Sequence, residues 1–243
     1  MENVKKSVSE LIEAALRFLR NKSYQSESEV NVKEHSIADL WSKNGFAEAE
    51  GNYSIAAQTG ERGVSHSNAY GCCAVTTGMR GMSASEWGGS IAGSTGFGSV
   101  SYSRAVGSIS ACTGTDSLAC GKGSYGIVCN SGFRGRAMTE GGASVAIASG
   151  FGGEAVAKGE KSIALVTGRN AAAKGELGSC LVFVDYSHPI ETEASKMTCK
   201  AVIVDGQAIK PDTYYSFVHG EIVEQKDVVR PARVFERRDS CDD

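Results

Sequence analysis

Seven Thr-Gly or Ser-Gly dipeptides follow one another at a constant spacing of 18 residues, without an insertion or a deletion. They are Thr59-Gly60, Thr77-Gly78, Thr95-Gly96, Thr113-Gly114, Ser131-Gly132, Ser149-Gly150 and Thr167-Gly168. Five residues before each of these glycines stands an aliphatic residue or a cysteine, and one more period leads to a leucine. We call this set the aliphatic column: Ile55, Cys73, Ile91, Ile109, Ile127, Val145, Ile163 and Leu181. A gapless short period is typical of a solenoid in which each repeat forms one coil.

An 18-residue unit is too short for two packed helices, and a weaker nine-residue sub-period divides it into two similar halves. This division predicts two short strands in each coil, joined by turns. Of the 30 glycines, 27 lie between Gly51 and Gly178, where turns that require positive φ would repeat. The sequence therefore predicts an all-β fold, a single-stranded parallel β-solenoid of about seven to eight coils.

Side-chain alternation predicts which side of each strand faces the interior. In the second strand of each unit one side is uniformly small, as at Ser99, Ser101 and Ser103, whereas the other side includes Arg104 and Lys158. Unpaired charges cannot be stacked inside a narrow coil, so we expect the small side to face inward. By the nine-residue symmetry the aliphatic column then faces outward, as an apolar stripe roughly 35 Å long.

An exposed apolar stripe of this length usually marks an interface, so the aliphatic column is the predicted oligomer interface. The alternative is that the column points inward and the small residues point outward. In that case the column would form the core of the coils.

Two units, residues 144–162 and 162–179, resemble the YadA-like head repeats of trimeric autotransporter adhesins, and the resemblance extends over roughly residues 54–185. It implies a left-handed parallel β-roll that forms a homotrimer along its length. The chain from Ser162 to Tyr215 is also similar to uncharacterised repeat proteins of gut-bacterial phages and prophages. In those proteins coils of this type end in a hairpin cap of no established activity.

The two ends of the chain differ from the repeats in composition. We expect five parts: an amphipathic helix at 1–22, a linker and capping segment at 23–50, the solenoid at 51–185, a β-hairpin cap at 186–235 and a mobile tail at 236–243. Residues 36–41 are predicted to form a short helix over the first coil. Within the cap, two hairpins are predicted, one pairing 200–204 with 207–210 and one pairing 214–218 with 221–223.

Composition and spacing argue against several functions. The formal net charge is −3, so no overall field favours nucleic acid or an anionic membrane. No cysteine or histidine has zinc-ligand spacing. Calcium-binding repeats carry an aspartate at a fixed offset in each repeat, whereas Asp116 is the one aspartate within these repeats, so neither a metal nor a cofactor is expected. Acyltransferases with 18-residue coils need an aliphatic residue every six positions, which this chain lacks. We therefore expect a protein that is not an enzyme.

One set of charged residues recurs. Arg62, Arg80 and Arg134 share an offset two residues after the repeat glycine, which makes them possible anion contacts. The alternative is that they are solvated charges at a corner of the coils. The N-terminus lacks the features of a secretion signal, and no apolar run reaches the ~18 residues of a membrane span, so we expect the bacterial cytoplasm or a phage virion.

Together these features predict an oligomeric, non-catalytic structural protein, a phage-derived virion, fibre or scaffold component with a trimer favoured. A protein or a glycan is a candidate partner. The alternative function is an intracellular, phage-encoded binding module that sequesters a host protein or a small anionic ligand.

Overall fold

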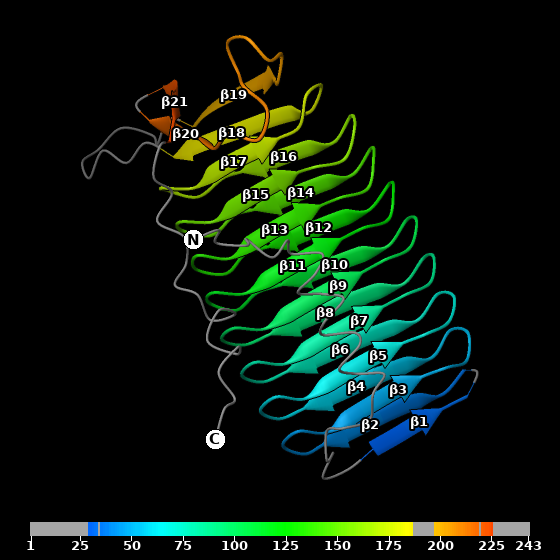
Figure 1. The fold of residues 1–243 in the computed structure, drawn as a ribbon. Coiled ribbons are helices and arrows are strands. Elements are labelled where there is room, and N and C mark those ends of the chain that lie inside the picture. Colours follow the sequence, from blue (N-terminus) through cyan, green and yellow to red (C-terminus); the bar gives the residue numbers. More distant parts are fainter. Residues whose placement is uncertain (1–28, 34, 187–196, 219, 226–243) are drawn as a thin grey trace, which may run out of the picture.

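The computed structural model describes residues 29–33, 35–186, 197–218 and 220–225, and within these ranges the fold is all-β. About eight turns of chain stack along one axis, from β1 at one end to β18–β21 at the other (Figure 1). The predicted parallel β-solenoid is therefore confirmed. The predicted helix at 1–22 and the tail at 236–243 lie outside the described residues.

Each turn contributes one strand to each of two sheets, as the nine-residue sub-period predicted. We call the sheets A and B. Sheet A comprises β1 (Glu29–Val32), β3 (Phe46–Ala49), β5 (Val64–Ser67), β7 (Met82–Ser85), β9 (Val100–Ser103), β11 (Leu118–Gly121), β13 (Arg136–Thr139), β15 (Glu154–Ala157), β17 (Ala172–Gly175), β20 (Tyr215–Val218) and β21 (Glu221–Glu224). Sheet B comprises β2 (Ile37–Trp41), β4 (Ile55–Thr59), β6 (Cys73–Thr77), β8 (Ile91–Thr95), β10 (Ile109–Cys112), β12 (Ile127–Asn130), β14 (Val145–Ala148), β16 (Ile163–Val166), β18 (Cys180–Tyr186) and β19 (Met197–Ile203).

Equivalent strands of successive turns pair in parallel, so a residue lies beside the residue 18 positions later, as Ile109 does beside Ile127. The narrow space between the sheets holds small side chains, mostly Ala and Ser. The first turns hold a small alanine cluster: Ala38, Ala47, Ala49 and Ala56. In the turns from β5 to β10, hydroxyls bond across the space between the sheets, for example between Ser83 Oγ and Ser94 Oγ at 2.9 Å. In the last turns, larger apolar groups such as Phe183 and Tyr215 fill it. From β5 onward the core therefore changes from hydrogen-bonded to hydrophobic along the axis.

The repeat glycines form a ladder at one corner of the coils. A Cβ on Gly114 would lie 1.7 Å from the carbonyl oxygen of Gly96 in the preceding turn, and one on Gly132 would lie 1.8 Å from that of Gly114. The same approach holds along the column from Gly78 to Gly168. Close stacking of backbone on backbone at this corner is why glycine recurs there.

The C-terminal cap differs from the prediction in one hairpin. β19 pairs antiparallel with β18, and residues 207–210 form no strand, so the predicted pairing of 200–204 with 207–210 is wrong. Asp205 Oδ1 accepts hydrogen bonds from the backbone N–H groups of Gln207 and Ile209, which makes the segment a compact turn with Ile209 buried. The second hairpin, β20 with β21, is confirmed.

The N-terminal part of the solenoid also differs from the prediction. Residues 36–41 are not a helix, because Ile37–Trp41 is β2 and pairs in parallel with β4. The coils begin at Glu29 rather than at residue 51, since β1 and β3 occupy part of the predicted linker. The physical reason is that Ser36-Ile37-Ala38 has the same pattern as Ser54-Ile55-Ala56, with the aliphatic residue outward and the alanine buried.

Candidate functional site

Seven members of the aliphatic column point outward from sheet B. Ile55, Ile91 and Ile127 are 38%, 43% and 42% exposed, and the other four are half-buried: Cys73, Ile109, Val145 and Ile163. Ile37, 65% exposed, extends the column by one turn at the N-terminal end. The outward orientation is therefore correct for these positions, and the alternative of an inward column is not.

Leu181 is the exception, and its assignment to the outward column is wrong. Cys180, not Leu181, pairs with Ile163, and the leucine side chain is fully buried beside Phe183 and Val204. The turn between β17 and β18 is one residue shorter than its equivalents, which shifts the register and reverses the facing of each residue. Ser179 carries the signal, because a serine or glycine directly precedes every other member of the column except Cys73.

The outer face of sheet B is uncharged from β4 to β16. A second column of small or apolar residues runs beside the first: Ala57, Val75, Gly93, Ala111, Cys129, Ile147, Leu165 and Val182. The eight strands from β4 to β18 are separated by seven intervals of ~4.8 Å, so the two columns extend for roughly 34 Å, and with a width of ~15 Å they span on the order of 500 Å². Exposed apolar patches of this size on a protein chain are often sites of interaction with another molecule.

The outer face of sheet A has a different character. It bears His66, Arg136, Glu154 and Lys174, and its central row is buried although it points away from the coil interior. That row forms a cluster with Tyr214 of the cap and consists of Ala84, Tyr102, Cys120, Met138 and Val156. Sheet B, not sheet A, therefore offers the open apolar face.

The three arginines proposed as anion contacts occupy a turn position that the backbone defines. Arg62, Arg80 and Arg134 have φ of 58°, 58° and 51°, in the left-handed region. The residues at the same offset in the other turns share this conformation: Asn44, Gly98, Asp116, Gly152 and Asn170. Gly, Asn and Asp are the residues that adopt it most readily, so the turn geometry explains these five residues, whereas arginine is uncommon in this conformation.

The charges of these arginines are partly compensated by neighbours. Arg134 makes two contacts of 3.0 Å with the Asp116 carboxylate of the preceding turn and lies over the Phe133 ring. Arg62 Nε lies 3.6 Å from a carboxylate oxygen of Glu61. The arginines therefore do not form a continuous row of free positive charge, and the alternative of corner charges describes Arg134 and Arg62 better.

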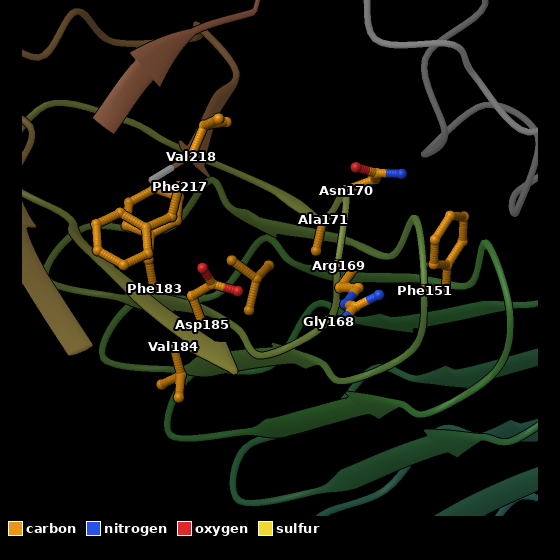
Figure 2. Close-up of a pocket in the computed structure, with 11 residues that line it drawn as sticks. Phe151, Gly168, Arg169, Asn170, Ala171, Phe183, Val184, Asp185, Phe217 and Val218 are labelled. Atoms are coloured by element: carbon orange, nitrogen blue, oxygen red, sulfur yellow. The ribbon is translucent and has the colours of Figure 1, made fainter. Parts of the chain in front are cut away.

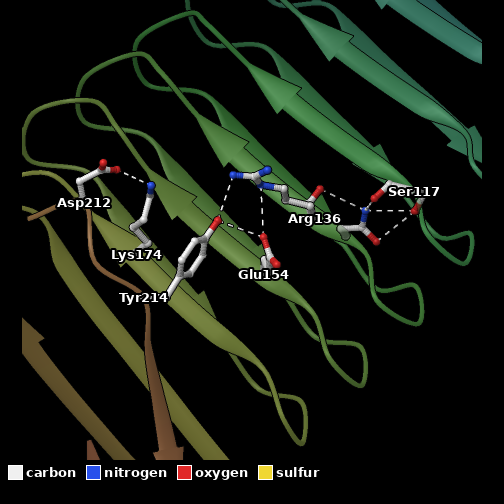
Figure 3. Close-up of polar contacts among 7 residues, drawn as sticks. Ser117, Arg136, Glu154, Lys174, Asp212 and Tyr214 are labelled. Carbon is white, nitrogen blue, oxygen red and sulfur yellow. Dashed lines mark hydrogen bonds and ion pairs between the residues drawn. The ribbon is translucent and has the colours of Figure 1, made fainter. Parts of the chain in front are cut away.

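A buried carboxylate connects the cap to sheet A. Glu154 Oε2 accepts a hydrogen bond of 3.0 Å from the Tyr214 hydroxyl, which accepts one from Arg136 (Figure 3). Lys174 forms an ion pair with Asp212 and lies over the Tyr214 ring. Glu154 Oε1 has no hydrogen-bond partner among the described residues, but the other contacts join Tyr214 and Asp212 to sheet A, so the network anchors the cap.

A cavity of about 390 Å³ lies where the last turn meets β20 (Figure 2). Phe183 and Phe217, whose ring centroids are 6.2 Å apart, line it together with Phe151. One cation, Arg169, and one anion, Asp185, also line it. With one charge of each sign, this cavity does not select for an anionic ligand.

Reactive groups within the described residues are few. Burial raises the pKa of the Cys112 and Cys120 thiols to about 12, so both are uncharged at neutral pH and are poor nucleophiles. In the same part of the chain, no group of three or more metal-binding side chains gathers. The described ranges also hold no helix that is both long and apolar enough to cross a membrane.

The fold and this uncharged face define a β-solenoid repeat protein with one open apolar side. Comparison with protein-family models, with curated proteins and with solved structures finds no match.

Proposed function

We propose that the protein is a non-catalytic structural component that assembles with copies of itself through the outer face of sheet B. A homotrimer is the favoured state, and a phage virion, fibre or scaffold is the favoured setting. One observation carries the proposal: from β4 to β16 this face has no charged residue, and three of its isoleucines, Ile55, Ile91 and Ile127, are about two-fifths exposed. Covering such a face removes apolar area from water at ~25 cal/mol per Å².

Light scattering coupled to size-exclusion chromatography tests the assembly. We expect about three times the chain mass of 25.4 kDa for the parent and a monomer for Ile109→Asp, because a carboxylate buried in an apolar contact is costly. Val106→Asp is the matched control, since Val106 is exposed at a corner outside the strands of sheet B. It should retain the parental mass.

A monomeric parent at micromolar concentration would refute the proposal. If Ile109→Asp does not fold, as judged by circular dichroism, Ile127→Ser tests the same face with a smaller change. Small-angle X-ray scattering of the parent then separates an elongated assembly from a compact one. The elongated profile is the one expected of a fibre or scaffold component.

A further inference from the structure

Four large aromatic residues stand on the corner of the solenoid where the chain passes from sheet A to sheet B: Tyr125, near the middle of the rod, and three that lie close together near the N-terminal end. Tyr53, Tyr70 and Trp87 belong to three successive turns and are 59%, 53% and 57% exposed. We call these three, with Asn52 and Asn68, the aromatic corner. Nothing in the assembly through sheet B uses them.

The rings are held in fixed positions. A Cβ on Gly71 would lie 2.8 Å from the Tyr53 ring, so this ring needs glycine beneath it, whereas a Cβ on Gly88 or Gly89 would be in ordinary contact with Tyr70. Tyr53 also stacks on His35 at 5.6 Å and meets Tyr70 edge to face at 6.2 Å. Tyr53 and Tyr70 therefore lie against the backbone of the next turn and against each other. A ligand would meet them already ordered, which lowers the entropy cost of binding.

Two asparagines place polar groups beside the rings. Asn52 Oδ1 accepts a hydrogen bond from the backbone N–H of Tyr70, and Asn68 Oδ1 accepts one from Trp87 Nε1 at 3.0 Å. These bonds use the amide oxygens and orient the amide N–H₂ groups, which have no partner among the described residues. The corner therefore combines apolar ring faces with outward hydrogen-bond donors.

The surroundings carry no charge of one prevailing sign. The turn segments 51–54, 68–73 and 87–90 hold no charged residue, and the charges that border them are of both signs: exposed Lys33 and Glu50, and Glu86, which contacts His66. A strongly charged ligand would therefore find no cluster of complementary charge at this corner. A neutral ligand that has both apolar C–H faces and hydroxyl groups fits the rings and the amides together.

We propose that the aromatic corner binds a neutral polysaccharide chain. Sugar rings present C–H faces that pack on aromatic rings, and their hydroxyls accept from and donate to amides and phenols. Three turns cover roughly 10 Å at ~4.8 Å per turn, which suits a stretch of chain rather than one monosaccharide. This proposal is independent of the assembly through sheet B.

An array of immobilised glycans with neutral and acidic members tests the proposal. We expect the full-length protein to bind neutral members. Tyr70→Ala and Trp87→Ala should each weaken binding at least about tenfold, as for aromatic residues at the centre of an interface. Phe97→Ala is the matched control, because Phe97 is an exposed aromatic residue on the opposite corner. It should bind as the parent does.

A fluorescence titration gives an independent measurement. Trp41 and Trp87 are the two tryptophans of the chain, so Trp41→Phe leaves Trp87 as the sole reporter. A neutral oligosaccharide identified on the array should change its emission. The proposal is overturned if the parent protein binds only acidic glycans or no glycan. It is also overturned if the Tyr70→Ala/Trp87→Ala double variant still binds neutral glycans. A fall in oligomer mass in that double variant would overturn it as well, since the corner would then be a contact between copies.

Discussion

Replacement of Gly114 by alanine tests the claim that the coils stack backbone on backbone. The new Cβ would lie 1.7 Å from the Gly96 carbonyl oxygen and 2.4 Å from the Gly96 carbonyl carbon. Both are main-chain atoms, so no side-chain rotation relieves the overlap. The two turns would have to separate at this corner by roughly 1.5 Å, about a third of the ~4.8 Å spacing between strands.

That separation would stretch the hydrogen bonds on either side of the contact. The N–H of Thr113 donates to the Ser94 carbonyl at 3.2 Å, and the N–H of Gly98 donates to the Thr115 carbonyl at 2.9 Å. Overpacking costs about 1–3 kcal/mol, and each weakened bond adds about 1 kcal/mol. We expect a loss of about 3–5 kcal/mol in the free energy of unfolding, a large part of the ~5–15 kcal/mol of a typical domain.

Gly93 supplies the control for this experiment. It lies within β8, and a Cβ built there has nothing within 4 Å. Gly93→Ala should be neutral or stabilise by up to about 1 kcal/mol, because alanine restricts the unfolded chain. Urea unfolding followed by circular dichroism, at one protein concentration, compares the three proteins. Similar midpoints for the two variants would refute the stacking argument.

Three further outcomes follow from the contacts. Burial alone lowers the pKa of His66, but hydrogen bonds and charges from Glu48 and Glu86 raise it from 6.5 to about 9. The resulting stability of about 3 kcal/mol is fully present below pH ~6.5 and is lost as the pH rises through ~9. His66→Asn should remove this pH dependence of the urea midpoint. Arg80→Gly should be neutral or stabilise by up to about 1 kcal/mol in thermal melts, since glycine tolerates the left-handed turn, and a marked loss would contradict that reading. Tyr214→Phe should cost about 1–3 kcal/mol and increase hydrogen exchange in β20 and β21, whereas unchanged exchange would show that the hydroxyl does not anchor the cap.

The repeat period was enough to predict the architecture, because gapless spacing leaves one way of stacking the turns. The N-terminal limit of the coils is hard to predict because the Thr-Gly or Ser-Gly dipeptide is replaced by Trp41-Ser42 in the turn that precedes Thr59-Gly60. The register at Leu181 was missed because a single deleted residue in a turn does not alter the composition of the strand that follows.

Two features of the outer surface needed the structure for other reasons. A mixture of Arg with Gly98, Asp116 and Asn170 at one offset signals a left-handed turn, and this signal was present in the sequence but was interpreted as a charge pattern. The burial of Tyr102 and Met138 could not be inferred, because alternation tells which side of a sheet a residue faces but not what covers that side.

Stacking without insertions has a consequence for how such a protein can change in length. Each turn between β4 and β17 contacts the turn before it through the same columns, so a complete 18-residue unit can be duplicated or removed with every column still aligned. The rod would grow or shrink in steps of ~4.8 Å while both end structures stay the same. The number of 18-residue units therefore sets the length of the rod, and the gain or loss of one unit would change that length by one step.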